Sequence, residues 1–130
     1  MPASTARDRD RVLLILHRGR DRWTAPGGGV EGDETFAQAA VREVREETGI
    51  DCRATDLAGV WRNVAASAGD DRRVHYLAAV FAGRDEGGTL DVQAAELDGA
   101  AWFARPPERV SDTVEALAER WWADASYGSL

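Results

Sequence analysis

The sequence contains no lysine: its sixteen basic residues are all arginines, against 23 acidic residues, and the formal net charge is −7. Proteins that bind nucleic-acid polymers usually present a basic surface that displaces counterions from the phosphates. The acidic balance therefore argues against general nucleic-acid binding. It also implies that a cation must mediate binding if the substrate is itself an anion.

Long hydrophobic runs and cysteine pairs are also missing. The longest apolar stretches, residues 12–16 and 76–82, are shorter than the ~20 residues that cross a bilayer, and the N-terminus has no signal-peptide core. The single cysteine, Cys52, cannot form an internal disulfide and is expected to be a small apolar filler. We therefore expect a soluble, cytoplasmic protein that has no membrane partner.

The chain length of 130 residues, with 44% apolar residues, suits a single hydrophobic core. Residues 1–10 are polar and charged and are expected to form a flexible end, while residues 11–130 are expected to form one domain. The predicted strands are residues 12–16, 54–64, 73–82 and 100–103, with a brief strand at 23–25, and the predicted helices are residues 34–48 and 111–125. Strands and helices alternate, which predicts an α/β fold with a mixed sheet.

The helix predicted at residues 34–48 has the clearest ends in the chain. Asp33 is the predicted N-terminal cap, and Gly49 stands where a left-handed residue ends a helix. Apolar side chains, Phe36 among them, are expected to cover an arc of about 140° on this helix, at about 100° per residue. This arc is predicted to face the core.

Three glutamates, Glu43, Glu46 and Glu47, lie on the arc of this helix next to the apolar one. Like charges three and four residues apart repel each other, and Arg42 is a single cation that cannot neutralise all three. One interpretation is a solvated acidic face. The other is a site for a hard cation such as Mg²⁺, which prefers carboxylates, water and substrate phosphates as ligands.

A longer motif separates these two interpretations. The spacing is Gly28, five residues, Glu34, seven residues, and then Arg42-Glu43-Val44-Arg45-Glu46-Glu47-Thr48-Gly49-Ile50. It matches the Nudix box, Gly-x5-Glu-x7-Arg-Glu-U-x-Glu-Glu-x-Gly-U with U aliphatic, at every specified position. Trp23 and Pro26 before the box and Glu96 after it also look like features of that family. The chain therefore resembles the Nudix hydrolases, and in particular their MutT-like members.

The resemblance implies an α/β/α sandwich around a mixed β-sheet. It also implies Mg²⁺-dependent hydrolysis of a nucleoside diphosphate linked to another group, with Mn²⁺ as a substitute ion. By the same resemblance, the metal ligands would be Glu43, Glu46 and Glu47, one of them acting as base, together with the carbonyl of Gly27 or Gly28. Arg42 and Glu34 would orient these ligands through ion pairs, and Gly28 and Gly49 would serve the backbone geometry of the box.

Several residues outside the box are candidates for the same site. A further acidic ligand is expected from Glu96, with Asp85 and Glu86 as alternatives, and a surface role is the competing interpretation for each. The predicted substrate contacts are Arg18, Arg20 and Arg22 for phosphates, and Trp61 and Tyr76 for a base. A solvated loop is the alternative for the arginines, and core packing is the alternative for the aromatic residues. His17 and His75 have no partner at a catalytic spacing.

The substrate expected from the short chain and the approach to the box is a nucleoside or deoxynucleoside triphosphate, cleaved to the monophosphate and pyrophosphate. The alternatives are ADP-ribose, a nucleotide sugar, a dinucleoside polyphosphate, a non-catalytic nucleotide sensor and an acidic structural domain. The partner is thus a small-molecule nucleotide. A homodimer also stays open, because Trp121 and Trp122 are adjacent on the last predicted helix and are not both expected to be buried.

Overall fold

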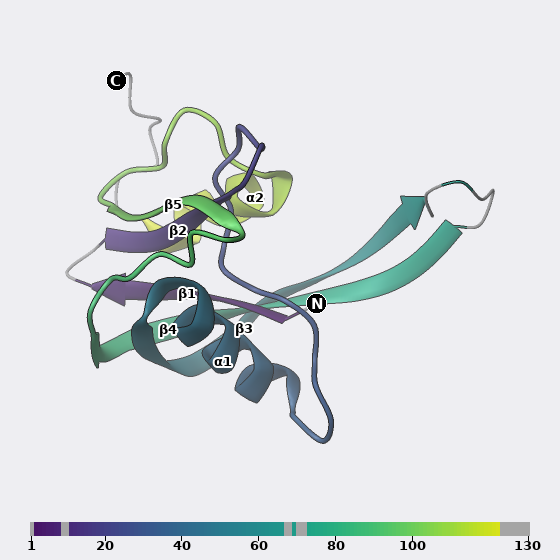
Figure 1. Ribbon diagram of the computed structural model, residues 1–130, viewed down its shortest axis with the longest axis horizontal. Helices are drawn as coiled ribbons and strands as arrows, with labels where there is room; N and C mark the ends of the chain where they lie inside the picture. The colour runs from purple at the N-terminus through teal and green to yellow at the C-terminus, as the bar shows by residue number, and fades with distance from the viewer. Residues whose placement is uncertain (1, 9–10, 67–68, 70–72, 123–130) are drawn as a thin grey trace.

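The computed structural model describes residues 2–8, 11–66, 69 and 73–122. Within these residues five strands form one sheet in the order β3-β4-β1-β2-β5, flanked by two helices (Figure 1). The strands are β1 (Pro2–Asp8), β2 (Arg11–His17), β3 (Ile50–Ala66), β4 (Arg73–Gly88) and β5 (Leu97–Phe103), and the helices are α1 (Phe36–Thr48) and α2 (Asp112–Trp121). β1 is parallel to β4 and antiparallel to β2, so the sheet is mixed, as predicted.

The central strand β2 supplies core side chains to both faces of the sheet. Val12 and Leu14 pack in a buried cluster with Val114 of α2, while Leu13 packs in a second cluster with Val44 of α1. This alternation is the period of two that a strand requires. One helix therefore covers each face, which confirms the predicted α/β/α sandwich.

The N-terminal segment differs from its prediction. The sequence predicted a flexible end here, whereas residues 2–8 form β1, which lies between β4 and β2 in the sheet. Their composition contains no buried-strand pattern. Backbone pairing with two neighbouring strands supplies the hydrogen-bond partners instead, and a hydrophobic pattern does not report that interaction.

Helix α1 begins two residues later than predicted and is capped by Thr35 instead of Asp33. The Thr35 side chain accepts a hydrogen bond from the Gln38 N–H at 3.1 Å, and the Gln38 side chain accepts one from the Thr35 N–H at 2.9 Å. This reciprocal pair satisfies two backbone donors at the helix start. Gly49 ends the helix with a φ of 77°, as predicted. Phe36 is 48% exposed because the buried positions of α1 begin one turn further on.

The hairpin formed by β3 and β4 is longer than predicted, since pairing extends from Ile50↔Gly88 to Ala66↔Arg73. Gly87 and Gly88 belong to the end of β4, and their φ values of 127° and 89° are ones that glycine tolerates. No helix in the described part of the chain is both long and apolar enough to span a bilayer.

The two adjacent tryptophans correct another expectation, because both are buried, with exposed fractions of 3% for Trp121 and 2% for Trp122. The prediction assumed that both lie on one helix, about 100° apart. In the structure α2 ends at Trp121, and Trp122 has extended backbone geometry. Its indole N–H donates to the carbonyl of Phe103 at 2.8 Å, which satisfies its polar atom in the core. The predicted continuation of this helix to residue 125 lies outside the described residues.

Candidate functional site

The most unusual side chain of the fold is Glu47, in the last turn of α1, which is 3% exposed. No cation pairs with it among the described residues; its Oε1 accepts a hydrogen bond from the Gly27 N–H at 2.8 Å. Burial, followed by repulsion from Glu43, Glu96 and Glu46, raises the pKa of Glu47 to about 8 against the lowering effect of that hydrogen bond. A buried carboxylate with so little compensation is a site where a cation would be stabilised.

Arg42 organises the carboxylates on the exposed side of α1. Its guanidinium binds both oxygens of Glu34, at 2.8 and 3.0 Å, and donates to the Gly29 carbonyl at 2.9 Å. The same group contacts Glu43 at 2.9 Å and Glu46 at 3.1 Å. The hydrogen bond to Arg42 lowers the pKa of Glu34, and the pKa of Arg42 is raised in turn. Arg42 therefore ties the glycine-rich loop to α1 and fixes the directions of two glutamates.

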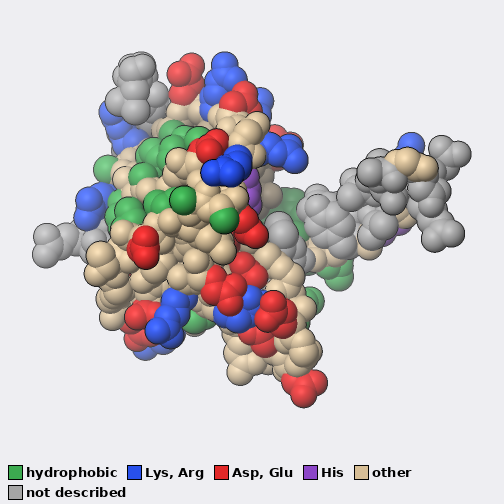
Figure 2. All heavy atoms as spheres, in the orientation of Figure 1, with side chains coloured by type: hydrophobic (Ala, Val, Ile, Leu, Met, Phe, Trp, Pro, Cys, Tyr) green, Lys and Arg blue, Asp and Glu red, His purple; other side chains and the backbone are tan. Residues whose placement is uncertain are grey.

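The glycine-rich loop lies directly on this cluster. A Cβ atom placed at Gly28 would be 2.4 Å from the carboxyl carbon of Glu43, so glycine lets the loop backbone lie against this side chain without moving it. At Gly29 an added Cβ would meet nothing within 4 Å. Figure 2 shows the acidic side chains gathered between α1 and the loop that precedes it.

Glu96 joins this cluster from a segment far away in sequence. The segment is anchored to the end of α1, because the Gln93 N–H donates to the Glu47 carbonyl at 3.0 Å and the Asp91 N–H donates to the Thr48 carbonyl at 2.7 Å. Glu96 is close enough to Glu47 to raise its pKa. The alternatives lie elsewhere: Asp85 accepts from the Gly87 N–H at 2.8 Å, and Glu86 lines a separate groove between α1 and β3.

The cluster can be tested as a metal site. In the described part of the chain no three acidic, histidine or cysteine side chains converge closely enough to form a ready-made cage. The reason lies in the contacts above, since Glu43 and Glu46 turn to Arg42 and Glu47 turns to the Gly27 N–H. The donor set still fits a hard divalent ion, because it is made of carboxylate oxygens. Rotation of these side chains away from their present partners is what such an ion would require.

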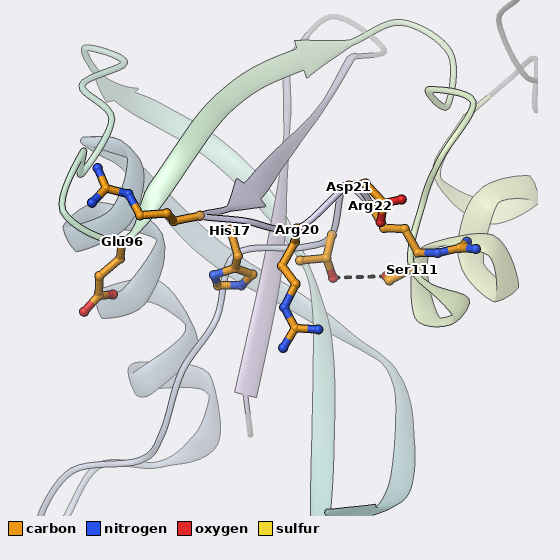
Figure 3. A pocket seen from close by; sticks show the side chains of 8 residues that line it. His17, Arg20, Asp21, Arg22, Glu96 and Ser111 are labelled. Atoms are coloured by element: carbon orange, nitrogen blue, oxygen red, sulfur yellow. Dashed lines mark hydrogen bonds between the residues drawn. The ribbon is translucent and has the colours of Figure 1, made fainter.

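A cavity of about 780 Å³ adjoins Glu96 (Figure 3). His17, the last residue of β2, and Arg20, in the segment that follows it, lie between Glu96 at one end and Ser111 at the other. Arg18 donates to the Ala94 carbonyl at 2.9 Å, so its position is fixed. The described residues that line the cavity are His17, Arg18, Arg20, Asp21, Arg22, Thr24, Glu96 and Ser111. The three arginines named from the sequence are therefore brought together with Glu96.

Two hydroxyl groups in this cavity were not among the residues chosen from the sequence. The Oγ1 of Thr24 and the Oγ of Ser111 are 3.0 Å apart, and Ser111 also caps α2. The only sequence signal for Ser111 was its place at the start of the last predicted helix. Thr24 had no signal, because it reaches the cavity through an isolated bridge to Ile15 on β2.

Trp61, one of the two aromatic candidates, is not among the described residues that line this cavity. Trp61 packs against the α2-side core, as do Trp23 and Phe103, and Trp102 packs against the α1-side core. The core-packing alternative therefore describes Trp61. The side chain of Tyr76 lies outside the described residues, and His75 is exposed on β4.

Sequence and structure comparisons with known proteins find members of one family. A family model described as NUDIX domain matches residues 4–121. A MutT-like protein of Streptomyces ambofaciens is 32% identical over 108 residues, covering 83% of this chain and 63% of that protein. The 8-oxo-dGDP phosphatase NUDT18 of Homo sapiens is 34% identical over 104 residues, covering 75% of this chain and 29% of that protein. A crystal structure of a MutT NUDIX hydrolase from Burkholderia pseudomallei matches with a TM-score of 0.72 and 25% identity, covering 88% of this chain and 90% of that one. This chain thus spans less than two thirds of the length of both sequence relatives.

Proposed function

Because the chain belongs to the NUDIX domain family, we propose that it is a hydrolase that cleaves a phosphoric anhydride bond of a nucleotide with the help of a divalent metal ion. The observation that carries this proposal is the burial of Glu47, without a cation partner in the described structure, beside Glu43, Glu46 and Glu96. A purely structural helix has no need for such a group, which opposes folding unless it is protonated or neutralised.

The proposed ligands of the ion are Glu43, Glu46, Glu47 and Glu96, and Mg²⁺ is the proposed ion with Mn²⁺ as a substitute. A carbonyl of Gly27 or Gly28 is a further proposed ligand, since the loop backbone lies against Glu43 and Glu47. When bound, a divalent ion reduces the negative charge that attacking water meets at a diphosphate and makes that water more acidic.

The protein's own groups have distinct proposed roles. One of the three box glutamates accepts the proton of the attacking water, as a general base. Glu47 must release its own proton before it serves as a ligand or base, because its pKa is raised to about 8. Arg42 and Glu34 position the loop and the other two glutamates through their ion pairs.

The proposed substrate is a nucleoside or deoxynucleoside triphosphate, with the monophosphate and pyrophosphate as products. The cavity beside Glu96 has room for a nucleotide part, and Arg18, Arg20 and Arg22 offer charge for phosphates in an otherwise acidic protein. Similarity to an 8-oxo-dGDP phosphatase favours nucleoside diphosphates, oxidised guanine included, as the second candidate.

A substrate panel tests this proposal directly. It contains the common ribo- and deoxynucleoside triphosphates, 8-oxo-dGTP and 8-oxo-dGDP, ADP-ribose, a nucleotide sugar and a dinucleoside polyphosphate, assayed with Mg²⁺ and then Mn²⁺. We expect a triphosphate to be the best substrate and pyrophosphate to be a product. A preference of about tenfold, or 1.4 kcal/mol, for ADP-ribose, the nucleotide sugar or the dinucleoside polyphosphate would reject the proposed triphosphate substrate. The proposed metal site would be unaffected by that result.

The two alternatives to an enzyme have their own readouts. A nucleotide sensor binds a nucleotide, with a shift in melting temperature, and releases no product in the panel. An acidic structural domain shows no effect of Mg²⁺ on thermal unfolding. We expect Mg²⁺ to raise the melting temperature, because a ligand that binds only the folded state stabilises it by mass action.

A further inference from the structure

The hairpin of β3 and β4 extends beyond the rest of the sheet. β1 pairs with β4 only from Ala79 to Arg84, so residues 61–66 and 73–78 form a two-stranded ribbon. We call this ribbon, together with Val60 at its base, the arm. Figure 1 shows the arm projecting away from both helices. A two-stranded hairpin is marginally stable alone in water, and a third strand or another packed surface is what usually stabilises it.

One face of the arm and its base is apolar and exposed. Trp61 and Ala78 are register partners, and Trp61 packs toward the α2-side core. The neighbouring positions Val60 and Leu77 therefore face the opposite way, and the register shift between Leu57 and Gly59 brings Leu57 to the same face. The exposed fractions of Leu57, Val60 and Leu77 are 54%, 54% and 55%. Their partners Phe81, Ala79 and Arg62 place all three on one continuous face. Aliphatic side chains exposed together in this way mark a surface that another surface covers.

The described residues of the same face also include basic side chains. Arg62 lies opposite Leu77, and His75 and Arg73 follow at alternate positions along β4. All three are exposed, and no carboxylate of the described residues pairs with them. In a chain of net charge −7 this arrangement calls for a partner surface that carries both exposed apolar and exposed acidic side chains.

The loop before α1 has that complementary character. Val30 and Phe36 are 37% and 48% exposed, and between them stand Glu31 and Asp33, both exposed. Arm-to-arm packing would bring these basic side chains against each other or against leucine and valine. Arm-to-loop packing matches apolar with apolar and basic with acidic side chains.

We propose that this protein forms a two-fold dimer in which the arm of each protomer packs on the 30–36 loop of a second copy. The arrangement is self-complementary, as a closed two-fold interface requires, because each protomer supplies one arm and one loop. An arm face that is seven residues long, at ~3.3 Å per residue, and two strands wide covers about 230 Å². Two arms and two loops each contribute a surface of this size, so the reciprocal dimer buries about 900 Å² in total. An interface of that size is weak, and the dimer is expected only at micromolar concentrations or above.

Sedimentation equilibrium from about 1 µM to about 1 mM tests the dimer with the whole chain. We expect a concentration-dependent change from 14.1 kDa to twice that mass. Val60→Ser on the arm and Phe36→Ser on the loop should each weaken dimerisation at least tenfold. Leu90→Ser is the matched control, since Leu90 is 38% exposed and belongs to neither surface. Circular dichroism and thermal melts establish that each variant folds.

Charge reversal gives a second test that does not depend on removing apolar side chains. Arg62→Asp and Asp33→Arg should each weaken the dimer, and the double variant should recover it, because both changes are present in both protomers. A monomer at every concentration overturns the proposal, as does a dimer that these variants leave unchanged. Weakening by the arm variants alone rejects the loop as the partner surface, and growth beyond a dimer rejects the two-fold closure.

Discussion

The backbone N–H of Gly27 donates a hydrogen bond of 2.8 Å to the buried carboxylate of Glu47. This contact joins the glycine-rich loop to the last turn of α1, twenty residues away in sequence. It partly offsets the effect of burial, which favours the protonated form of this group. The loop and the helix end therefore form one unit, and a substitution in either of them should alter the geometry of the other.

Glu47→Gln should reduce turnover by at least about two orders of magnitude, because it removes a negative ligand from the proposed metal site. The fold should remain, since glutamine has the same shape and can keep the hydrogen bond from Gly27. Glu46→Gln should behave in the same way. Glu119→Gln, on the exposed side of α2, is the control and should keep wild-type activity. Full activity of both box variants with saturating Mg²⁺ removes this helix from the mechanism.

The pH dependence of stability should reveal Glu47 in the metal-free protein. Burial raises its pKa from 4.5 to about 8, so between these values the folded state keeps a proton that the unfolded chain has released. Its contribution to stability is therefore fully present below pH 4.5 and is lost as the pH rises to about 8. Melting temperatures in EDTA should fall across this window more steeply for the wild type than for Glu47→Gln. Equal slopes would show that Glu47 ionises normally.

Metal binding should be linked to the same proton. At pH 7 the carboxyl of Glu47 is mostly protonated in the metal-free protein, given its pKa of about 8. A divalent ion needs the carboxylate, so binding should release about one proton. Titration calorimetry with Mg²⁺ in buffers of different ionisation enthalpy measures that number. Glu47→Gln, tested at concentrations where it still binds Mg²⁺, should release none.

The box motif predicts which region of the sequence holds the site. The neighbours of that region come from distant parts of the chain and are known only from the folded structure. The helical spacing of Glu43, Glu46 and Glu47 and the turn at Gly49 follow from local rules. Which glutamate is buried does not, because burial depends on the segment at residues 89–96 that packs over the end of α1. The helical period alone placed Glu47 only at the border of the core.

The misplaced elements share a physical cause. β1 has no apolar pattern and is held by backbone pairing on both sides. Asp33 and Thr35 are both good capping residues. Thr35 is the cap because the Gln38 side chain accepts a hydrogen bond from its N–H and because Glu34 forms an ion pair with Arg42. Trp122 leaves the helix to reach the carbonyl of Phe103. In each case a tertiary partner decided between local options of similar energy.

Arg42→Lys should lower kcat by about 10- to 100-fold, the usual cost of losing a group that orients metal ligands. Lysine keeps the charge but cannot bind both oxygens of Glu34 while contacting Glu43 and Glu46. Arg45→Lys, at a 75% exposed side chain on the same helix, is the matched control and should be nearly neutral. Glu34→Gln should cause a similar loss, and the double variant should lose less than the two losses combined. Additive losses would mean that the pair does not act as a unit.

Gly28→Ala should weaken Mg²⁺ binding and turnover by at least about tenfold, a loss of about 1.4 kcal/mol. The added methyl would be 2.4 Å from the carboxyl carbon of Glu43, so either the loop or this side chain must move. Gly29→Ala is the matched control, since its added methyl would meet nothing within 4 Å and its φ is not positive. Mg²⁺ titrations followed by tryptophan fluorescence, together with steady-state rates, measure both effects. Equal behaviour of the two alanine variants would show that the approach of Gly28 to Glu43 has no role in the site.

Arg20→Ala should raise the KM for a triphosphate several-fold and leave kcat within about threefold, because binding is lost equally in the ground and transition states. Arg20 projects into the cavity between Glu96 and Ser111, and no carboxylate among the described residues pairs with it (Figure 3). Its charge is therefore available to a phosphate. Arg105→Ala removes an equally exposed arginine outside the cavity and should leave KM unchanged. The effect of Arg20→Ala should shrink as ionic strength increases, since an exposed charge is screened over about 8 Å at physiological salt. An unchanged KM at low salt would place the phosphates away from this cavity, while the carboxylate site on α1 would remain.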